Sequence, residues 1–168
     1  MTADTRRGAK EGLEFGILAG MIFAIMEITA AAASGHPALM PLKMFASVVL
    51  GKAALEPTAG SSVLLVGIVA HVALSGAFGI VYSLVNQRFS VATQTQFGQQ
   101  AGIGLIAGTL LWFGNFQIVG RLLYPWFLRQ PQLPAMLMHA VSFGLPLGLF
   151  YAAAKRKARH IGRAAAHA

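Results

Sequence analysis

The chain has 168 residues, of which 56% are hydrophobic and only 11% are charged, whereas a soluble domain has about 25% charged residues. It contains no cysteine, which excludes disulfides, thiolate metal sites and thiol nucleophiles. Its net charge of +8 does not indicate a nucleic-acid partner, because the basic residues lie at the ends of apolar segments, where membrane proteins keep them. Long stretches without charge leave room for four membrane-spanning helices, so we expect residues 1–168 to form a single all-α membrane domain.

The first span is predicted over residues 13–33 and carries one carboxylate, Glu27, well inside the apolar run. An acidic residue at the centre of a membrane helix costs at least ~2.5 kcal/mol on insertion scales, so it is a functional-site candidate. Gly16 and Gly20 continue a stripe of glycines that starts at Gly12. Small residues at this spacing let helices approach closely in lipid. Because Glu27 lies nearly two turns beyond Gly20, we expect it on the same face, toward protein.

Residues 40–55 are too few and too interrupted to span a bilayer. Lys43, Ser47 and Gly51 recur every four residues, with apolar side chains around the other side. This pattern predicts a short amphipathic helix in the outer membrane interface, between the first and second spans. A re-entrant segment that partly caps the bundle is the alternative.

The second span is predicted over residues 62–85. Gly67, His71, Ser75 and Gly79 recur there every four residues, so His71 shares a face with small residues. That face is expected to be a helix contact.

The third span is predicted over residues 99–120. Gly104 and Gly108 form another stripe of small residues, and Asn115 lies seven residues beyond Gly108, on the same helical face. The segment that follows contains Tyr124 and Trp126 between basic residues, which is typical of the aromatic belt at headgroup level.

The fourth span is predicted over residues 134–154, with His139 in its first third. Pro146 lacks an N–H group for the helical ladder, which predicts a kink there. Gly144 and Gly148 form a small pair on roughly the opposite side from His139. This pair could be a second contact surface, as in a dimer, or incidental.

One polar side chain from each span falls at a similar depth. With a rise of ~1.5 Å per residue, Glu27, His71, Asn115 and His139 each lie about 4 to 8 Å outside the centre of their span. Two imidazoles and a carboxylate are ligand types for Zn²⁺, Fe²⁺ or Mn²⁺, and histidine titrates near neutral pH. The layer could therefore be a metal site at Glu27, His71 and His139, or a proton-responsive site. Two histidines could also ligate a b-type haem. A structural clamp, in which Glu27 bonds to a histidine, is the further alternative.

Basic residues are concentrated before the first span and after the fourth. Four spans put both termini on one side of the membrane, and the excess of Lys and Arg predicts that this side is cytoplasmic. The basic residues assigned to it are Arg6, Arg7, Lys10, Arg88, Lys155, Arg156, Lys157, Arg159 and Arg163.

The carboxylate in the first span, the His71-centred second span, the Gly-rich third span and the His139 span with its basic tail resemble a known group. They are similar to YagU-like proteins, which are small bacterial four-span inner-membrane proteins of unknown function. The resemblance implies a location in the bacterial inner (plasma) membrane and little about activity.

Two functions from different classes follow from these observations. The first is an integral membrane protein whose buried Glu/His layer senses or moves protons or metal ions. The second is a non-catalytic accessory or scaffold subunit that joins a larger membrane complex, or a homo-oligomer, through its glycine faces. A haem-b electron-transfer subunit is a more distant alternative. No nucleotide-binding loop, H-E-x-x-H pair or G-x-S-x-G elbow is present, so an enzyme is not expected.

Overall fold

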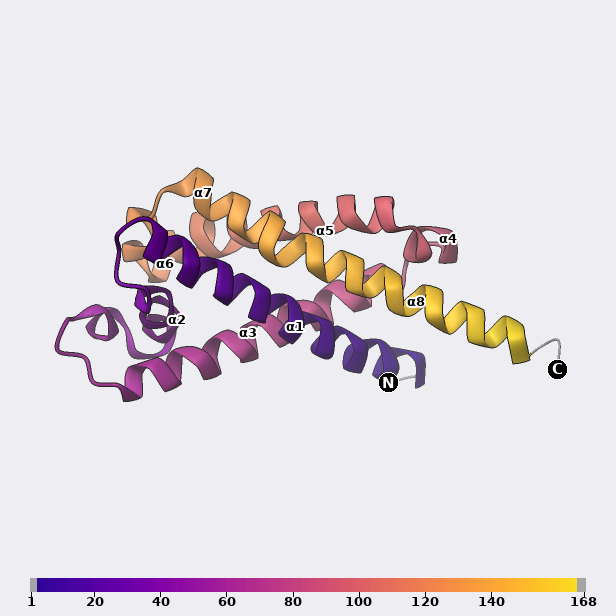
Figure 1. Cartoon of the computed structure of the whole chain (residues 1–168), viewed down its shortest axis with the longest axis horizontal. Helices are drawn as coiled ribbons and strands as arrows, with labels where there is room; N and C mark the ends of the chain where they lie inside the picture. The colour runs from indigo at the N-terminus through magenta and orange to yellow at the C-terminus, as the bar shows by residue number, and fades with distance from the viewer. Residues whose placement is uncertain (1–2, 166–168) are drawn as a thin grey trace.

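The computed structural model describes residues 3–165, and every regular element in that part of the chain is helical. Four helical runs are long and apolar enough to cross a membrane, which confirms the predicted all-α membrane fold. They cover Ala3–Ala33, Ser62–Asn86, Phe97–Leu123 and Gln132–Gly162. Figure 1 shows these runs lying roughly along one long axis, with both termini toward the same end.

The four runs contain the four predicted spans, and the first and fourth runs continue as helices well beyond the predicted limits at the end of the bundle that carries the termini. The third and fourth runs are each built from more than one element. In chain order the elements are α1 (Ala3–Ala33), α2 (Met40–Leu50), η1 (Lys52–Leu55), α3 (Ser62–Asn86), α4 (Val91–Thr95), α5 (Phe97–Trp112), η2 (Phe113–Gly120), α6 (Arg121–Leu123), η3 (Pro125–Arg129), α7 (Gln132–Leu137), η4 (Met138–Gly144) and α8 (Leu145–Ala165).

Helices α1 and α3 pack backbone to backbone. A Cβ atom added to Gly12 would meet the carbonyl oxygen of Gly79, and one added to Gly16 would meet the carbonyl oxygen of Ser75. Gly20 likewise faces the side chain of Ser75. Without side chains at these positions, the two helices gain close van der Waals contact, the main source of helix association in lipid.

The third and fourth runs form a second close pair. Gly104 of α5 faces the backbone of Gly144, and Gly108 faces the backbone of His139. Gly148 packs on the backbone of Gln100. The Gly144 and Gly148 pair, for which a dimer contact was one hypothesis, thus makes a contact within the chain.

Two segments are π-helical, η2 and η4. In a π-helix the hydrogen bonds run from residue i to i+5, which changes the direction of the side chains that follow. η4 ends at Gly144, immediately before the turn that contains Pro146. Local π geometry is one way in which membrane helices compensate for the N–H that a proline lacks. A π-helical segment therefore lies directly before the position at which Pro146 predicts a kink.

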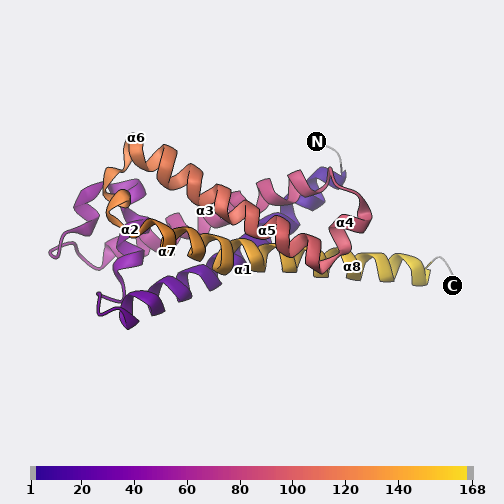
Figure 2. The same cartoon turned by 90° about the horizontal axis from the view of Figure 1, so that it is seen from above.

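The short helix α2 lies between the first and second spans, as predicted, and it packs on α3. Gly67 of α3 faces the carbonyl of Leu42. On the other side of α2, Trp126 Nε1 donates to Ser47 Oγ at 2.9 Å, and Tyr124 OH donates to the Val48 carbonyl at 3.2 Å. Both views place α2 at the end of the bundle away from the termini (Figures 1 and 2).

The buried centre is a cluster of apolar and aromatic side chains contributed by α1, α3 and the fourth run. Its members are Ala19, Phe23, Tyr82, Phe143, Leu147 and Tyr151. The outward faces are also apolar: Leu65, Ile106 and Leu110 are 63–65% exposed. Such faces suit contact with the lipid bilayer, so the protein is a membrane protein with lipid-facing helices.

Candidate functional site

His71 projects from α3 toward α1. Its Nε2 atom lies 2.8 Å from the carbonyl oxygen of Gly20. Because a carbonyl only accepts, Nε2 carries the hydrogen and donates it, which leaves Nδ1 as a free acceptor. The imidazole stacks on Phe45 of α2 with centroids 4.2 Å apart, and on Phe23 at 5.9 Å.

His139 lies in the π-helical segment η4. Its Nδ1 donates to the carbonyl of Ala135 at 2.8 Å, so its Nε2 is left as the acceptor. The ring packs edge-on against Phe23 at 4.7 Å and Phe116 at 5.5 Å. The two predicted histidines therefore meet on one aromatic ring, Phe23, and each keeps one ring nitrogen that can take a proton.

Glu27 lies one helical turn beyond Phe23 on α1 and is half-buried. Within residues 3–165 its carboxylate makes no hydrogen bond or ion pair. A clamp between Glu27 and His71 or His139 is thus not formed. A carboxyl group without a partner in a membrane-spanning helix is a functional-site candidate.

Asn115 lies in η2 and is half-buried, and its side chain has no hydrogen bond in the described part of the chain. The bonded polar side chain in this segment is Gln117, whose Oε1 accepts from Arg121 at 2.9 Å and whose Nε2 donates to Gln132 Oε1 at 2.9 Å. The prediction for Asn115 assumed regular α-helical spacing, which ends where η2 begins.

The described residues contain no group of three His, Asp or Glu side chains that could hold a metal ion. The Nε2 atom of His71 is already bonded to the Gly20 carbonyl. As arranged, Glu27, His71 and His139 therefore do not form a three-ligand metal site.

A second group of buried polar side chains lies at the terminal end of the bundle. Gln100 is 0% exposed and Asn86 is 1% exposed. Gln100 Oε1 accepts from Tyr82 OH at 2.8 Å, while its Nε2 donates to Asn86 Oδ1 at 2.8 Å and to the Thr93 carbonyl at 3.3 Å. These bonds satisfy the buried amides and tie α3 to α5.

The fourth run continues this second group of polar side chains. Together with Tyr151, Lys155 and Glu11, the group is called the inner network below. Tyr151 OH donates to Gln94 Oε1 at 3.0 Å, and its ring packs edge-on against Tyr82 at 5.9 Å. One turn later, Lys155 Nζ lies 5.1 Å from the Tyr151 ring and donates to Glu11 Oε2 at 2.6 Å. Glu11 and Lys155 are only 18% and 19% exposed, so this ion pair is largely withdrawn from solvent.

The sequence analysis missed this inner network. Asn86 and Gln100 lie at the ends of predicted spans, where polar residues are ordinary. One signal was available. On the first run, positions 11, 15, 19, 23 and 27 read Glu, Phe, Ala, Phe, Glu; on the fourth run, positions 139, 143, 147, 151 and 155 read His, Phe, Leu, Tyr, Lys. Each stripe has titratable residues at its ends, and the residues between them are apolar apart from Tyr151.

No protein-family model, curated protein or solved structure matches this chain. The resemblance to YagU-like proteins therefore stays a prediction.

Proposed function

We propose that this membrane protein is proton-responsive and that protons bind at an outer site formed by Glu27, His71 and His139. The carrying observation is the Glu27 carboxyl group, half-buried in a membrane-spanning helix with no partner in the described chain. An ionised group in apolar surroundings is costly unless it is paired, whereas the neutral acid is tolerated. Binding and release of a proton at Glu27 therefore changes how well α1 packs in the membrane.

The two imidazoles extend the outer site to α2. His71 stacks on Phe45, and two residues further along α2 Ser47 accepts the Trp126 N–H. Protonation at the free Nδ1 of His71 would alter the stacking of its ring on Phe45. A change in that contact would shift the position of α2 between α3 and η3. The site thus has a direct route by which a proton can change the conformation of the outer end.

The buried apolar side chains in the middle of α1 and the fourth run favour proton sensing over an open proton channel. Ala19, Phe143 and Leu147 are at most 5% exposed and lie between the outer site and the inner network along α1 and the fourth run. Proton movement across this layer would need the helices to open. A conformational response to protons needs no such path.

We further propose that the protein resides in a bacterial inner membrane, as its resemblance to YagU-like proteins implies, with both termini in the cytoplasm. The support is the excess of Lys and Arg at the terminal end, together with the position of both termini at one end of the bundle (Figure 1).

The test is a pH titration of the protein in liposomes by infrared spectroscopy. We expect a carbonyl band of a protonated carboxyl group that titrates with pH and is lost in Glu27→Gln. The matched control is Glu14→Gln, which removes an exposed carboxylate from the same helix. A spectrum of Glu27→Gln identical to that of the wild type would contradict the proposal.

The conformational response can be followed through Trp126 fluorescence after Trp112→Phe, because these are the two tryptophans of the chain. We expect a pH-dependent change in Trp126 emission that Glu27→Gln or His71→Gln diminishes. No dependence on pH in the protein that retains both residues would count against proton sensing.

A role as an accessory subunit is the second candidate. Gly98 and Gly102, four residues apart on α5, have no neighbouring atom within 4 Å of an added Cβ. The glycines predicted to bind a partner, Gly16 and Gly104 among them, are instead covered within the chain. Stable co-purification with a larger assembly would favour this candidate if replacing Gly102 by a larger residue abolished it.

A further inference from the structure

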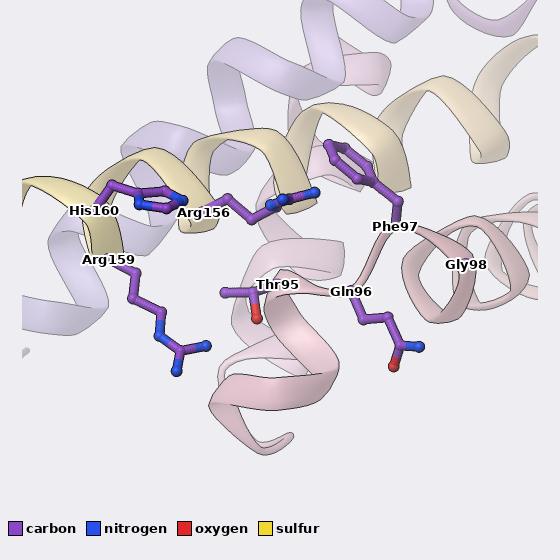
Figure 3. Close-up of a pocket in the computed structure, with 7 residues that line it drawn as sticks. All are labelled: Thr95, Gln96, Phe97, Gly98, Arg156, Arg159 and His160. Atoms are coloured by element: carbon purple, nitrogen blue, oxygen red, sulfur yellow. The ribbon is translucent and has the colours of Figure 1, made fainter.

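A cavity of about 530 Å³ lies at the terminal end of the bundle, apart from the outer site (Figure 3). Residues 95–98, at the junction of α4 and α5, form one wall, and α8 forms the other. The lining residues are Thr95, Gln96, Phe97, Gly98, Arg156, Arg159 and His160. Its volume is in the range of small-molecule sites, roughly 300–1,000 Å³.

The charge of this cavity is unbalanced. Arg156 and Arg159 line it, and no acidic side chain does. The Arg156 guanidinium lies over the Phe97 ring, 4.9 Å from its centroid, and points from α8 toward that ring (Figure 3). Among the described residues, neither arginine forms a salt bridge; the acceptor of both recorded ion pairs is Glu11, with Arg7 and Lys155. Two guanidinium groups at one cavity without a carboxylate are suited to an anion.

The level of the cavity along α8 identifies the kind of anion. The apolar segment 145–154 ends where the basic segment 155–163 begins, and the cavity opens at this boundary. A boundary between an apolar and a basic helical segment is typical of the headgroup level, where lipid phosphate groups lie. About two turns further along α5 from the cavity, Leu105 and Ile106 are 36% and 63% exposed and offer an apolar surface to lipid.

We propose that this cavity binds the phosphate headgroup of an anionic phospholipid from the leaflet on the side of the termini. Arg156 and Arg159 supply the charge and the N–H donors, and His160 adds a further donor. Basic pockets beside membrane helices recognise anionic headgroups in this way. The membrane boundary and the apolar surface of α5 favour a lipid over free phosphate. This inference does not depend on proton binding at Glu27.

The experiment is native mass spectrometry of the full chain in detergent with added phosphatidylglycerol or with phosphatidylcholine of the same acyl chains. We expect bound phosphatidylglycerol in preference to phosphatidylcholine, and a loss of about tenfold or more in its affinity in Arg156→Gln/Arg159→Gln. The matched control is Arg88→Gln/Lys157→Gln, which removes the same charge at the same end of the bundle outside this cavity. The control should lose much less.

Arg156→Lys/Arg159→Lys keeps the charge and separates planar recognition from simple attraction. We expect an intermediate affinity, because lysine cannot bind phosphate oxygens in a two-point fork. Both arginines are exposed, and circular dichroism of each variant verifies that the helices are retained. Equal losses in the pocket and control variants, or no preference for phosphatidylglycerol, would overturn the proposal. Full displacement of the lipid by an equal concentration of inorganic phosphate would overturn the choice of a lipid.

Discussion

At the scale of single residues, Gly16 lets α1 pack closely on α3 because it has no side chain. A Cβ atom there would meet the Ser75 carbonyl oxygen and would lie 2.8 Å from the Gly79 Cα. Both are backbone atoms of a packed helix, so neither can move without shifting α3. We therefore expect Gly16→Ala to destabilise the bundle by about 1–3 kcal/mol, the usual cost of overpacking.

The measurement is thermal unfolding in detergent followed by tryptophan fluorescence. Gly102→Ala is the matched control, because nothing lies within 4 Å of an added Cβ at that position of α5. Alanine also favours a helix over glycine by roughly 0.5–1 kcal/mol, so this variant should be neutral or slightly stabilised. Equal losses in both variants would show that close contact at Gly16 does not hold the pair together.

At the scale of helices, the ion pair between Glu11 and Lys155 joins α1 to α8 near the termini. Removing Glu11 leaves Lys155 largely buried and unpaired, and removing Lys155 leaves Glu11 with only the exposed Arg7, whereas removing both leaves no largely buried charge at this contact. We expect Glu11→Gln and Lys155→Met each to lower stability, and the double variant to lose less than the sum of the two. The coupling energy should be about 1 kcal/mol or more.

A double-mutant cycle by thermal unfolding in detergent measures this coupling. Arg7→Gln is the control, because Arg7 bonds to Glu11 at 3.0 Å but its side chain is 66% exposed. An exposed pair contributes little, typically 0.2–1 kcal/mol. Strictly additive losses at Glu11 and Lys155 would mean that the pair does not couple the two helices.

Hydropathy and spacing were sufficient for the helices but not for every side-chain direction. Four apolar runs predicted four spans, and glycines four residues apart predicted faces that the structure places at helix contacts. The π-helical segments were not predictable, because the hydrogen-bond register inside an apolar helix leaves no trace in hydropathy. The position predicted for the Asn115 side chain assumed α-helical spacing, which does not hold in η2. The side chain that forms hydrogen bonds in this segment is Gln117. The lack of a bonded partner for Glu27 among the described residues was equally unpredictable from the pattern, because hydrogen bonding of a single carboxylate depends on rotamers and on its neighbours.

At the scale of the whole molecule, titratable groups occupy both ends of the bundle and apolar side chains its middle. The outer end holds Glu27 and the two imidazoles, and the terminal end holds the Glu11–Lys155 pair and the arginines of the lipid cavity. A change in protonation at one end can reach the other through rigid movement of α1 and the fourth run, because Ala19, Phe143 and Leu147, in the middle of the two stripes, carry no polar group.

The same arrangement makes a prediction on topology. Because the chain has no cysteine, single cysteines can be introduced at Ala3, Thr58 and Ala168 and labelled with a membrane-impermeant maleimide. Ala168 lies outside the described residues, but α8, the helix that leads toward it, ends at the same end of the bundle as the start of α1 (Figure 2). We expect no labelling at Ala3 or Ala168 in intact cells and labelling at Thr58, because the basic terminal end should face the cytoplasm. Labelling of both termini from outside would reverse the orientation and leave the bundle intact. Labelling of one terminus alone would contradict the four-span fold itself, because an even number of spans must return the chain to the side on which it began.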